Sequence, residues 1–325
     1  MSEHAAGVSL GYWQDRDPLE VLETARLADE LGYRQLWAGE MATFDAFAVA
    51  TAVGLQTASI SITIGPLAVA VRDPMGMAMG TASVAALTGR PVALAVGASS
   101  PVVVERWHGR RFTGSARRLR ETVEALRPLL DGDKAWYAGE LVRTEGYGLR
   151  LPVPPSSLTV AAFGAASIRV AAELADRMVI NLCPPTLAER LRDRLAKAAA
   201  DSGRTAPPLA AWVVAAVDPT DEAIDQLRRA LVGYLAAPGY ADMFAFAGFG
   251  ALVDLARSGA SAVELFAAIP PELVAAVGCV GDVATCRRRV AAYASAGVDE
   301  VVLVPATAGD PGGRRTLTAL APPQA

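Results

Sequence analysis

Histidine and cysteine are scarce in this chain of 325 residues, which has two histidines and three cysteines. The cysteines, Cys183, Cys279 and Cys286, form no C-x-x-C pair and are odd in number. A disulfide framework is therefore not expected, and a reducing cytoplasm fits this cysteine usage better. Two histidines offer too few ligands for a histidine-based zinc site, so no metal centre is predicted.

An excess of positive charge and long apolar runs are also lacking. The net charge is −4, which argues against a nucleic-acid partner. Arginine-rich spots at 117–120 and 287–289 lie in helical patterns and are interpreted as solvated helix faces. No apolar run reaches the roughly 20 residues that cross a bilayer, and residues 1–7 do not resemble a signal peptide. The sequence thus predicts a soluble, cytoplasmic protein with no membrane partner.

What the chain does have is a regular alternation of short apolar runs and helical patterns. Eight strands are predicted, at 8–12, 36–37, 60–71, 91–97, 158–163, 178–181, 209–217 and 298–304. This alternation is typical of parallel β/α architecture, and eight strands within about 300 residues favour a (β/α)8 TIM barrel with insertions over a doubly wound sheet. No G-x-G-x-x-G turn follows the first strand, which weakens a dinucleotide-binding interpretation further.

The predicted barrel is one domain over residues 1–325, with three irregular parts. A small hairpin is expected at 135–149, and extra, mostly helical material at about 234–275. The tail after Pro305, rich in proline and glycine, is expected to be either bound to the surface or loose. Capping signals predict where several helices start, at Asp17-Pro18, Asp73-Pro74, Thr186 with Glu189, Asp218-Pro219 and Asp282.

Active sites of such barrels lie at the carboxyl ends of the strands, where several notable residues gather. Glu40 ends an otherwise apolar strand, so it is a candidate for proton transfer with a raised pKa; a helix cap or an ion pair is the structural alternative. Asn181 ends the sixth strand.

Gly65-Pro66 interrupts a β-branched strand. Proline cannot donate to a central ladder, so this pair predicts a bulge or break, and a cis bond is possible there. A bulge at a barrel mouth can press backbone against a flat ring; a simple kink at the strand end is the alternative.

Two turns after strands are candidate phosphate sites. Phe163, Gly164 and Ala165 lead into a helix whose free amide groups favour an anion, although any such turn needs small residues. Ala98 and Ser99 offer a second group of donors. They do not form a G-x-S-x-G elbow, because Pro101 occupies the last place and no histidine follows as a partner. His108 lies in the loop beyond; both functional and structural roles are open, and we favour a structural one in which Trp107-His108-Gly109 orders the loop by packing and hydrogen bonding.

Taken in order, several stretches resemble the luciferase-like oxidoreductases that use a flavin or coenzyme F420. They are Leu31-Gly32-Tyr33 to Glu40, Arg72-Asp73-Pro74, Gly89-Arg90 to Gly97, Val104 to Gly109, Ala161 to Gly164 with Ala171 to Asp176, and Val280-Gly281 with Ala296 to Asp299. No single motif is specific, but the ordered set spans nearly the whole chain.

The resemblance implies a bacterial-luciferase-like barrel that forms a homodimer and carries its cofactor across the strand ends. It maps the bulge that backs the cofactor ring onto Gly65-Pro66, the phosphate turns onto Ala98-Ser99 and Gly164-Ala165, and the acidic residue onto Glu40. Some F420-dependent relatives carry histidine directly after that acid, whereas this chain has Met41. The basic residue expected after strand six is also missing, with Cys183-Pro184 in its place.

Three functions follow from the resemblance. The first is hydride transfer between coenzyme F420 and a small organic substrate, and the second is an FMN-dependent monooxygenase that uses reduced flavin and oxygen. The third is a cofactor-binding protein without catalysis, which the absence of histidine at Met41 keeps open. The stretch from Ser99 to Gly109 favours F420 over FMN.

Overall fold

The computed structural model describes residues 6–152 and 156–323, and within them the chain divides into two compact units. Unit 1 comprises residues 1–34, 180–192 and 210–325, and unit 2 comprises residues 35–179 and 193–209. Strand β8 (Arg177–Asn181) and helix α6 (Pro185–Asp201) are each divided between the units. That the chain folds as one domain stays a prediction.

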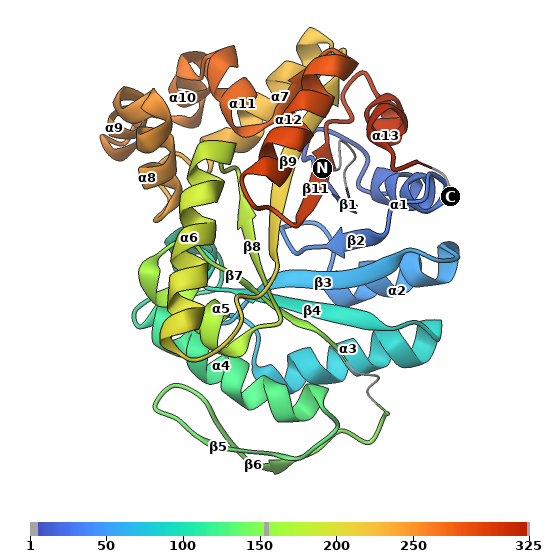
Figure 1. Ribbon diagram of the computed structural model, residues 1–325, viewed down its shortest axis with the longest axis vertical. Helices are drawn as coiled ribbons and strands as arrows, with labels where there is room; N and C mark the ends of the chain where they lie inside the picture. Colours follow the sequence, from blue (N-terminus) through green and yellow to red (C-terminus); the bar gives the residue numbers. More distant parts are fainter. Residues whose placement is uncertain (1–5, 153–155, 324–325) are drawn as a thin grey trace. The chain divides into compact units, whose positions relative to one another are not determined.

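Unit 2 is built on parallel strands that pair in chain order (Figure 1). Its strands are β2 (Gln35–Ala38), β3 (Ser61–Ala68), β4 (Val92–Gly97), β7 (Leu158–Ala161) and the first part of β8. Its helices are α2 (Ala46–Gln56), α3 (Pro74–Thr88), α4 (Ser115–Leu130) and α5 (Ala165–Leu174), which pack side by side in that order. A π-helix, η1 (Val102–Trp107), follows β4, and β5 (Ala135–Ala138) pairs with β6 (Arg143–Tyr147) as the predicted hairpin.

The strands of unit 1 come from both ends of the chain. β1 (Gly7–Ser9) pairs with β11 (Glu300–Pro305), which pairs with β9 (Leu209–Val217), and β9 pairs with β10 (Cys279–Gly281), all in parallel. β10 is a short strand that the sequence analysis did not predict. The helices are α1 (Glu20–Glu30), α7 (Asp221–Val232), α12 (Val283–Ser295) and α13 (Arg314–Leu320), with the short 3-10 helix η3 (Pro311–Gly313) before α13.

The extra segment between α7 and β10 is helical. It holds α8 (Tyr240–Phe244), the π-helix η2 (Ala245–Phe249), α9 (Gly250–Arg257), α10 (Ala262–Ala268) and α11 (Pro271–Val277). Within the described residues, none of the helices is both long and apolar enough to cross a membrane.

Three of the predicted helix starts are wrong by a few residues. α1 begins at Glu20, because Asp17 accepts a hydrogen bond from the amide of Leu19 and forms a turn ahead of the helix. α7 is capped by Thr220 and not by Asp218. α6 begins at Pro185, so Thr186 is already inside the helix and cannot be its N-cap. Asp73 and Asp282 cap α3 and α12 as predicted.

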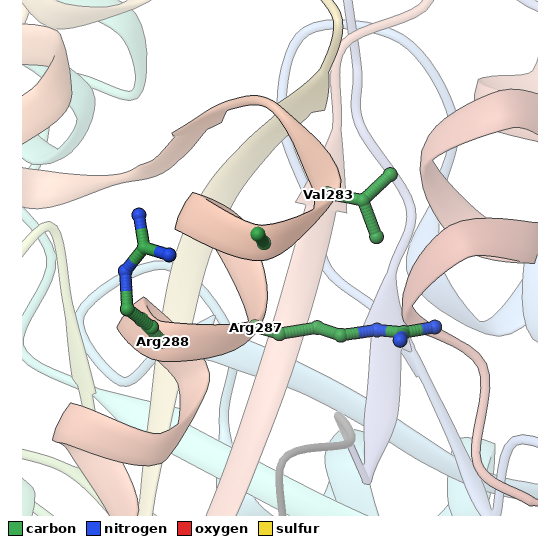
Figure 2. A pocket seen from close by; sticks show the side chains of 4 residues that line it. Val283, Arg287 and Arg288 are labelled. Carbon is green, nitrogen blue, oxygen red and sulfur yellow. The ribbon is translucent and has the colours of Figure 1, made fainter.

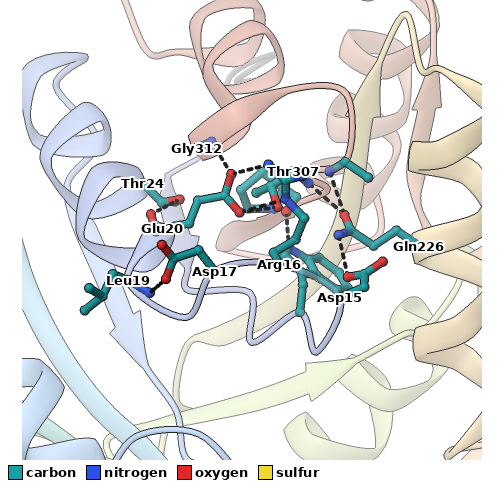
Figure 3. A network of polar contacts seen from close by, with 12 residues as sticks. Asp15, Arg16, Asp17, Leu19, Glu20, Thr24, Gln226, Thr307 and Gly312 are labelled. Carbon is teal, nitrogen blue, oxygen red and sulfur yellow. Dashed lines mark hydrogen bonds and ion pairs between the residues drawn. The ribbon is translucent and has the colours of Figure 1, made fainter.

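Of the two alternatives for the tail after Pro305, surface-bound or loose, the loose one is wrong, because a polar network binds the tail to the rest of unit 1 (Figure 3). The Glu20 carboxylate accepts hydrogen bonds from the Thr307 hydroxyl (2.7 Å) and the Gly312 amide (3.1 Å). Gln226 joins the same network: its oxygen accepts from the Thr307 amide (2.8 Å), and its nitrogen donates to Asp15 (3.0 Å). The tail is thus tied to both α1 and α7.

This network also sets the charge of Glu20. Burial alone would raise the pKa of Glu20, but hydrogen bonds from Arg16, Thr307 and Gly312 outweigh it and hold the pKa below its ordinary value. Glu20 therefore stabilises the fold as a carboxylate.

Candidate functional site

The predicted interruption of β3 is a bulge at Gly65-Pro66. The pairing of β3 with β4 shifts register between Ile64 and Leu67, and the Gly65–Pro66 peptide bond is cis. Gly65 has a φ of +113°, and a Cβ atom there would lie 2.2 Å from the carbonyl oxygen of Ala95. Only glycine fits this position, since a side chain would meet backbone that cannot move away.

Gly97, the last residue of β4, brings three strand ends together. A Cβ atom at Gly97 would lie 3.2 Å from Cβ of Ala161, which ends β7, and 3.8 Å from Cβ of Pro66 in the bulge. The bulge of β3, the end of β4 and the end of β7 therefore form a continuous surface of small side chains. The residues that meet at Gly97 are small, since glycine, alanine and proline supply these contacts.

Two backbone turns with open amide groups adjoin these strand ends. Ser99, two residues after β4, is exposed and adopts a left-handed φ of 64°, which is uncommon for a residue other than glycine. Gly164 is the N-cap of α5, no side chain caps that helix, and a Cβ atom on Gly164 would have nothing within 4 Å. The first amides of a helix have no partner within it, so this turn offers donors to an anion.

Glu40, two residues after β2, is held by Arg72, which follows β3. The Arg72 guanidinium donates to both carboxylate oxygens of Glu40, with a distance of 2.8 Å from Nε to Oε2. Glu40 is thus in an ion pair, the structural alternative considered for it, and its side chain keeps 22% exposure.

Arg72 binds a second carboxylate as well. Its Nη2 donates to Asp45, which caps α2 by accepting hydrogen bonds from Phe47 and Ala48 (both 3.0 Å). Burial would raise the pKa of Asp45, but the hydrogen bonds from Arg72 and from the helix amides outweigh it. The pKa of Asp45 therefore lies below its ordinary value. The guanidinium also lies 5.2 Å from the centre of the Phe47 ring. The sequence did not identify Arg72 and Asp45 as site residues, because Arg72 is separated from Glu40 by 32 positions and from Asp45 by 27. The available signal was that Arg72 follows an apolar strand, as Glu40 does.

Asn181 belongs to unit 1, whereas the other predicted site residues belong to unit 2. Its side-chain nitrogen donates to the Tyr240 hydroxyl (3.3 Å), and Tyr240 stacks against Tyr234 with ring centres 4.7 Å apart. Burial raises the pKa of Tyr240 above its ordinary value, so the hydroxyl stays protonated. Within its own unit, Asn181 fixes the start of the extra helical segment.

The loop after β4 matches its prediction in part. Residues 102–107 form π-helix η1, and Trp107 is 51% exposed, so it contributes little packing. The predicted hydrogen bonds are present, from the amide of Gly109 to the carbonyl of Glu105 (3.1 Å) and from the amide of Arg110 to the carbonyl of Val104 (2.9 Å). The amide of Phe112 also donates to the Glu105 side chain (3.2 Å).

A separate hollow of about 350 Å³ lies at the start of α12 and is lined by Val283, Ala284, Arg287 and Arg288 (Figure 2). The two guanidinium groups point in different directions, and each already donates, Arg287 to the carbonyl of Ala319 and Arg288 to the hydroxyl of Thr285. This hollow contains none of the predicted site residues. Among the described residues, no group of three or more His, Cys, Asp or Glu is arranged to hold a metal ion.

Comparison with known proteins defines first the fold and then the family. The chain superimposes on an F420-dependent tetrahydromethanopterin reductase from Methanopyrus kandleri with a TM-score of 0.82, at 18% identity and with 98% of each chain covered. It also superimposes on an FMN-containing type II Baeyer-Villiger monooxygenase from Pseudomonas putida, with a TM-score of 0.69, 18% identity, and 98% and 96% of the two chains covered. The fold is therefore the predicted (β/α)8 barrel of the luciferase-like type.

Residues 3–300 match the model of the luciferase-like monooxygenase family, so the chain belongs to this family of enzymes. In sequence it is 27% identical, over 348 residues, to a putative coenzyme F420-dependent oxidoreductase from Mycobacterium tuberculosis; the match covers 97% of this chain and 98% of the relative. The family predicted from the ordered motifs is confirmed, whereas the roles of individual site residues stay predictions.

Proposed function

We propose that the protein transfers a hydride between coenzyme F420 and a small organic substrate. The observation that carries this proposal is the surface formed by the Gly65-Pro66 bulge and Gly97, with the open turns at Ser99 and Gly164 beside it. A flat ring with a phosphate-bearing side chain fits these groups, because the surface is bare of large side chains and the turns offer amide donors. The F420-dependent relatives support the choice of cofactor.

In the proposed site the chain binds and orients, and the deazaflavin supplies the hydride chemistry when bound. Pro66 backs the ring, and Ala98, Ser99, Gly164 and Ala165 hold the phosphate through backbone amides, with Phe163 as a further contact.

Glu40 is the proposed catalytic residue, which takes up or returns the substrate's proton. Both of its oxygens accept from Arg72, yet each carboxylate oxygen can accept a second hydrogen bond, so Glu40 still has an acceptor position for the substrate.

A substitution at Gly164 tests the phosphate turn sharply. Gly164→Asp places a carboxylate at the start of α5, where nothing lies within 4 Å. Aspartate is a good N-cap, so the melting temperature should hold or rise, while repulsion weakens F420 binding about tenfold or more. Gly164→Asn is the matched neutral control and should bind F420 nearly as wild type does. Equal F420 affinity in both variants would remove this turn from the cofactor site.

Titration with F420 and with FMN, followed by fluorescence and melting temperature, decides between the cofactors. The FMN-containing structural relative keeps the FMN monooxygenase as the second candidate. Stabilisation by F420 alone supports the proposal, and stabilisation by FMN alone overturns it in favour of that candidate. Binding of F420 without turnover over a broad substrate panel would instead support the non-catalytic alternative. Glu40→Gln with unchanged turnover and intact binding would end its proton-transfer role.

We also propose that the protein acts as a homodimer through α2 and α3, which pack side by side in unit 2 (Figure 1). Residues 46–61 and 74–89 contain no charged side chain. Several large apolar residues of these two helices are exposed to solvent; their exposed fractions are 66% for Leu55, 53% for Met79 and 66% for Leu87. An uncharged, apolar outer face on two neighbouring helices is typical of a surface covered by a partner. Leu55→Glu with Leu87→Glu should yield monomers in sedimentation velocity, and a wild type that is already monomeric would refute the proposal.

A cytoplasmic location completes the proposal. All three cysteines are buried and unpaired, which fits a reducing compartment.

A further inference from the structure

The segment 106–111, which spans the end of η1 and the turn after it, carries several unpaired positive charges. Arg106, Arg110 and Arg111 are exposed, and among the described residues none of the three side chains has a hydrogen bond, an ion pair or a ring contact. His108 lies between them, also exposed and without such a contact. The one carboxylate on this turn, Glu105, accepts a hydrogen bond from the backbone of Phe112.

The arginines of the following helix behave differently. In α4, Arg117 pairs with Glu140, Arg118 donates to the carbonyl of Leu141, and Arg120 pairs with Glu173 and Glu124. The chain as a whole is acidic, with a net charge of −4. Residues 106–111 thus hold three unpaired guanidinium groups within six positions, whereas the three arginines at the start of α4 each have a partner.

The turn is held in shape although its side chains are free. Gly109 has a left-handed φ of 61°, which reverses the chain, and the amide of Arg110 returns to the carbonyl of Val104 (2.9 Å). Three guanidinium groups are thus displayed at fixed places along a short segment, and Trp107 adds an apolar surface that is 51% exposed. One phosphate would engage one or two of these forks, whereas a chain of carboxylates matches all three.

We propose that the turn at 106–111 binds the anionic tail of the cofactor, the row of glutamate carboxylates that coenzyme F420 carries beyond its phosphate. The proposal rests on the proposed function, since the turn begins only seven residues after Ser99, a residue of the proposed phosphate turn. Arginine forks pair with the successive carboxylates, and the methylene groups of the tail lie against Trp107.

The test compares two triple variants that lose the same charge. One carries Arg106→Ser, Arg110→Ser and Arg111→Ser. The control carries the same change at three exposed arginines elsewhere, Arg26, Arg257 and Arg314. Kd is measured by deazaflavin fluorescence for F420 with a glutamate tail and for the deazaflavin core without phosphate or glutamates, at about 0.05 M and about 0.5 M salt.

The first variant should lose about tenfold in affinity for tailed F420 at low salt, with less difference at high salt, because exposed charge pairs are weak and screened. Its affinity for the core, and the control's affinity for both ligands, should match wild type. Equal affinity of the two triple variants for tailed F420 overturns the proposal.

A second probe separates this proposal from the proposed function. If wild type binds neither deazaflavin, the proposed function fails, and tri-γ-glutamate alone is titrated while tryptophan fluorescence is followed. A saturable change that is lost in Trp107→Phe and in the first triple variant keeps the turn as an oligocarboxylate site. No change with tri-γ-glutamate in wild type then overturns that site too.

Discussion

Replacing Arg72 by methionine removes the guanidinium group that joins Glu40 to Asp45 and keeps an unbranched apolar stem in its place. The guanidinium makes two hydrogen bonds to Glu40 and one to Asp45, and its side chain is only 27% exposed. A hydrogen bond to a charged group contributes about 1.5–3 kcal/mol, and partial exposure reduces this. Two carboxylates are also left facing each other without a counter-charge. We expect a loss of about 2–3 kcal/mol in the free energy of unfolding.

Urea unfolding measures this loss as a shift of the midpoint at constant slope. Arg72→Lys keeps the charge but loses the bidentate geometry, so it should recover only part of the stability. In the double variant Glu40→Gln with Arg72→Met, the loss in the free energy of unfolding should be about 1 kcal/mol smaller than the sum of the two single losses, because the two side chains are in contact. A loss below about 0.5 kcal/mol in Arg72→Met, or full additivity, would refute the view that this cation organises the strand ends.

Three other predictions concern stability. Gly65→Ala should lower the free energy of unfolding by more than about 3 kcal/mol, because the new Cβ would lie 2.2 Å from the carbonyl oxygen of Ala95. Gly164→Ala, in open space, should change it by less than about 0.5 kcal/mol. Similar urea midpoints for the two variants would contradict this. The pKa of Glu20 is lowered in the folded protein, so its contribution is present at neutral pH and is lost as the pH falls through the carboxylate range; Glu20→Gln should flatten the acid limb of stability against pH, and an unchanged limb would be contrary evidence. Leu317→Ala, in the buried tail helix, should cost about 2–4 kcal/mol by thermal unfolding, and a loss below about 1 kcal/mol would mean that the tail is peripheral after all.

The strands were the most predictable part of the fold, because a buried parallel strand is a continuous apolar run between clear breaks. β9 occupies Leu209–Val217, the predicted range, since Pro208 precedes it and Asp218-Pro219 follows it. β10 was missed because a strand of three residues, Cys279–Gly281, carries no periodicity that differs from its surroundings.

The candidate site was predictable only where backbone chemistry decides it. Proline within a strand signals a bulge by itself, so Gly65-Pro66 could be read directly from the sequence. The partner of Glu40 could not be predicted in this way, because an ion pair across 32 positions depends on which strand ends meet. Whether the tail is bound or loose could not be decided from the sequence for the same reason, since Glu20 and Gln226 are the residues that hold it.

The pairing of β1 with β11 has a consequence for synthesis on the ribosome. One strand that pairs with β1, β11, is made only at Glu300–Pro305, and the loop after β1 is fastened by residues 307–312. The strands of unit 2 pair in chain order within residues 35–179, so that unit can begin to fold while the rest is being translated. The edge of β1 that pairs with β11 stays uncovered until almost the last codon has been read. A nascent chain stalled before residue 300 should therefore expose this edge of β1 to chaperones and proteases.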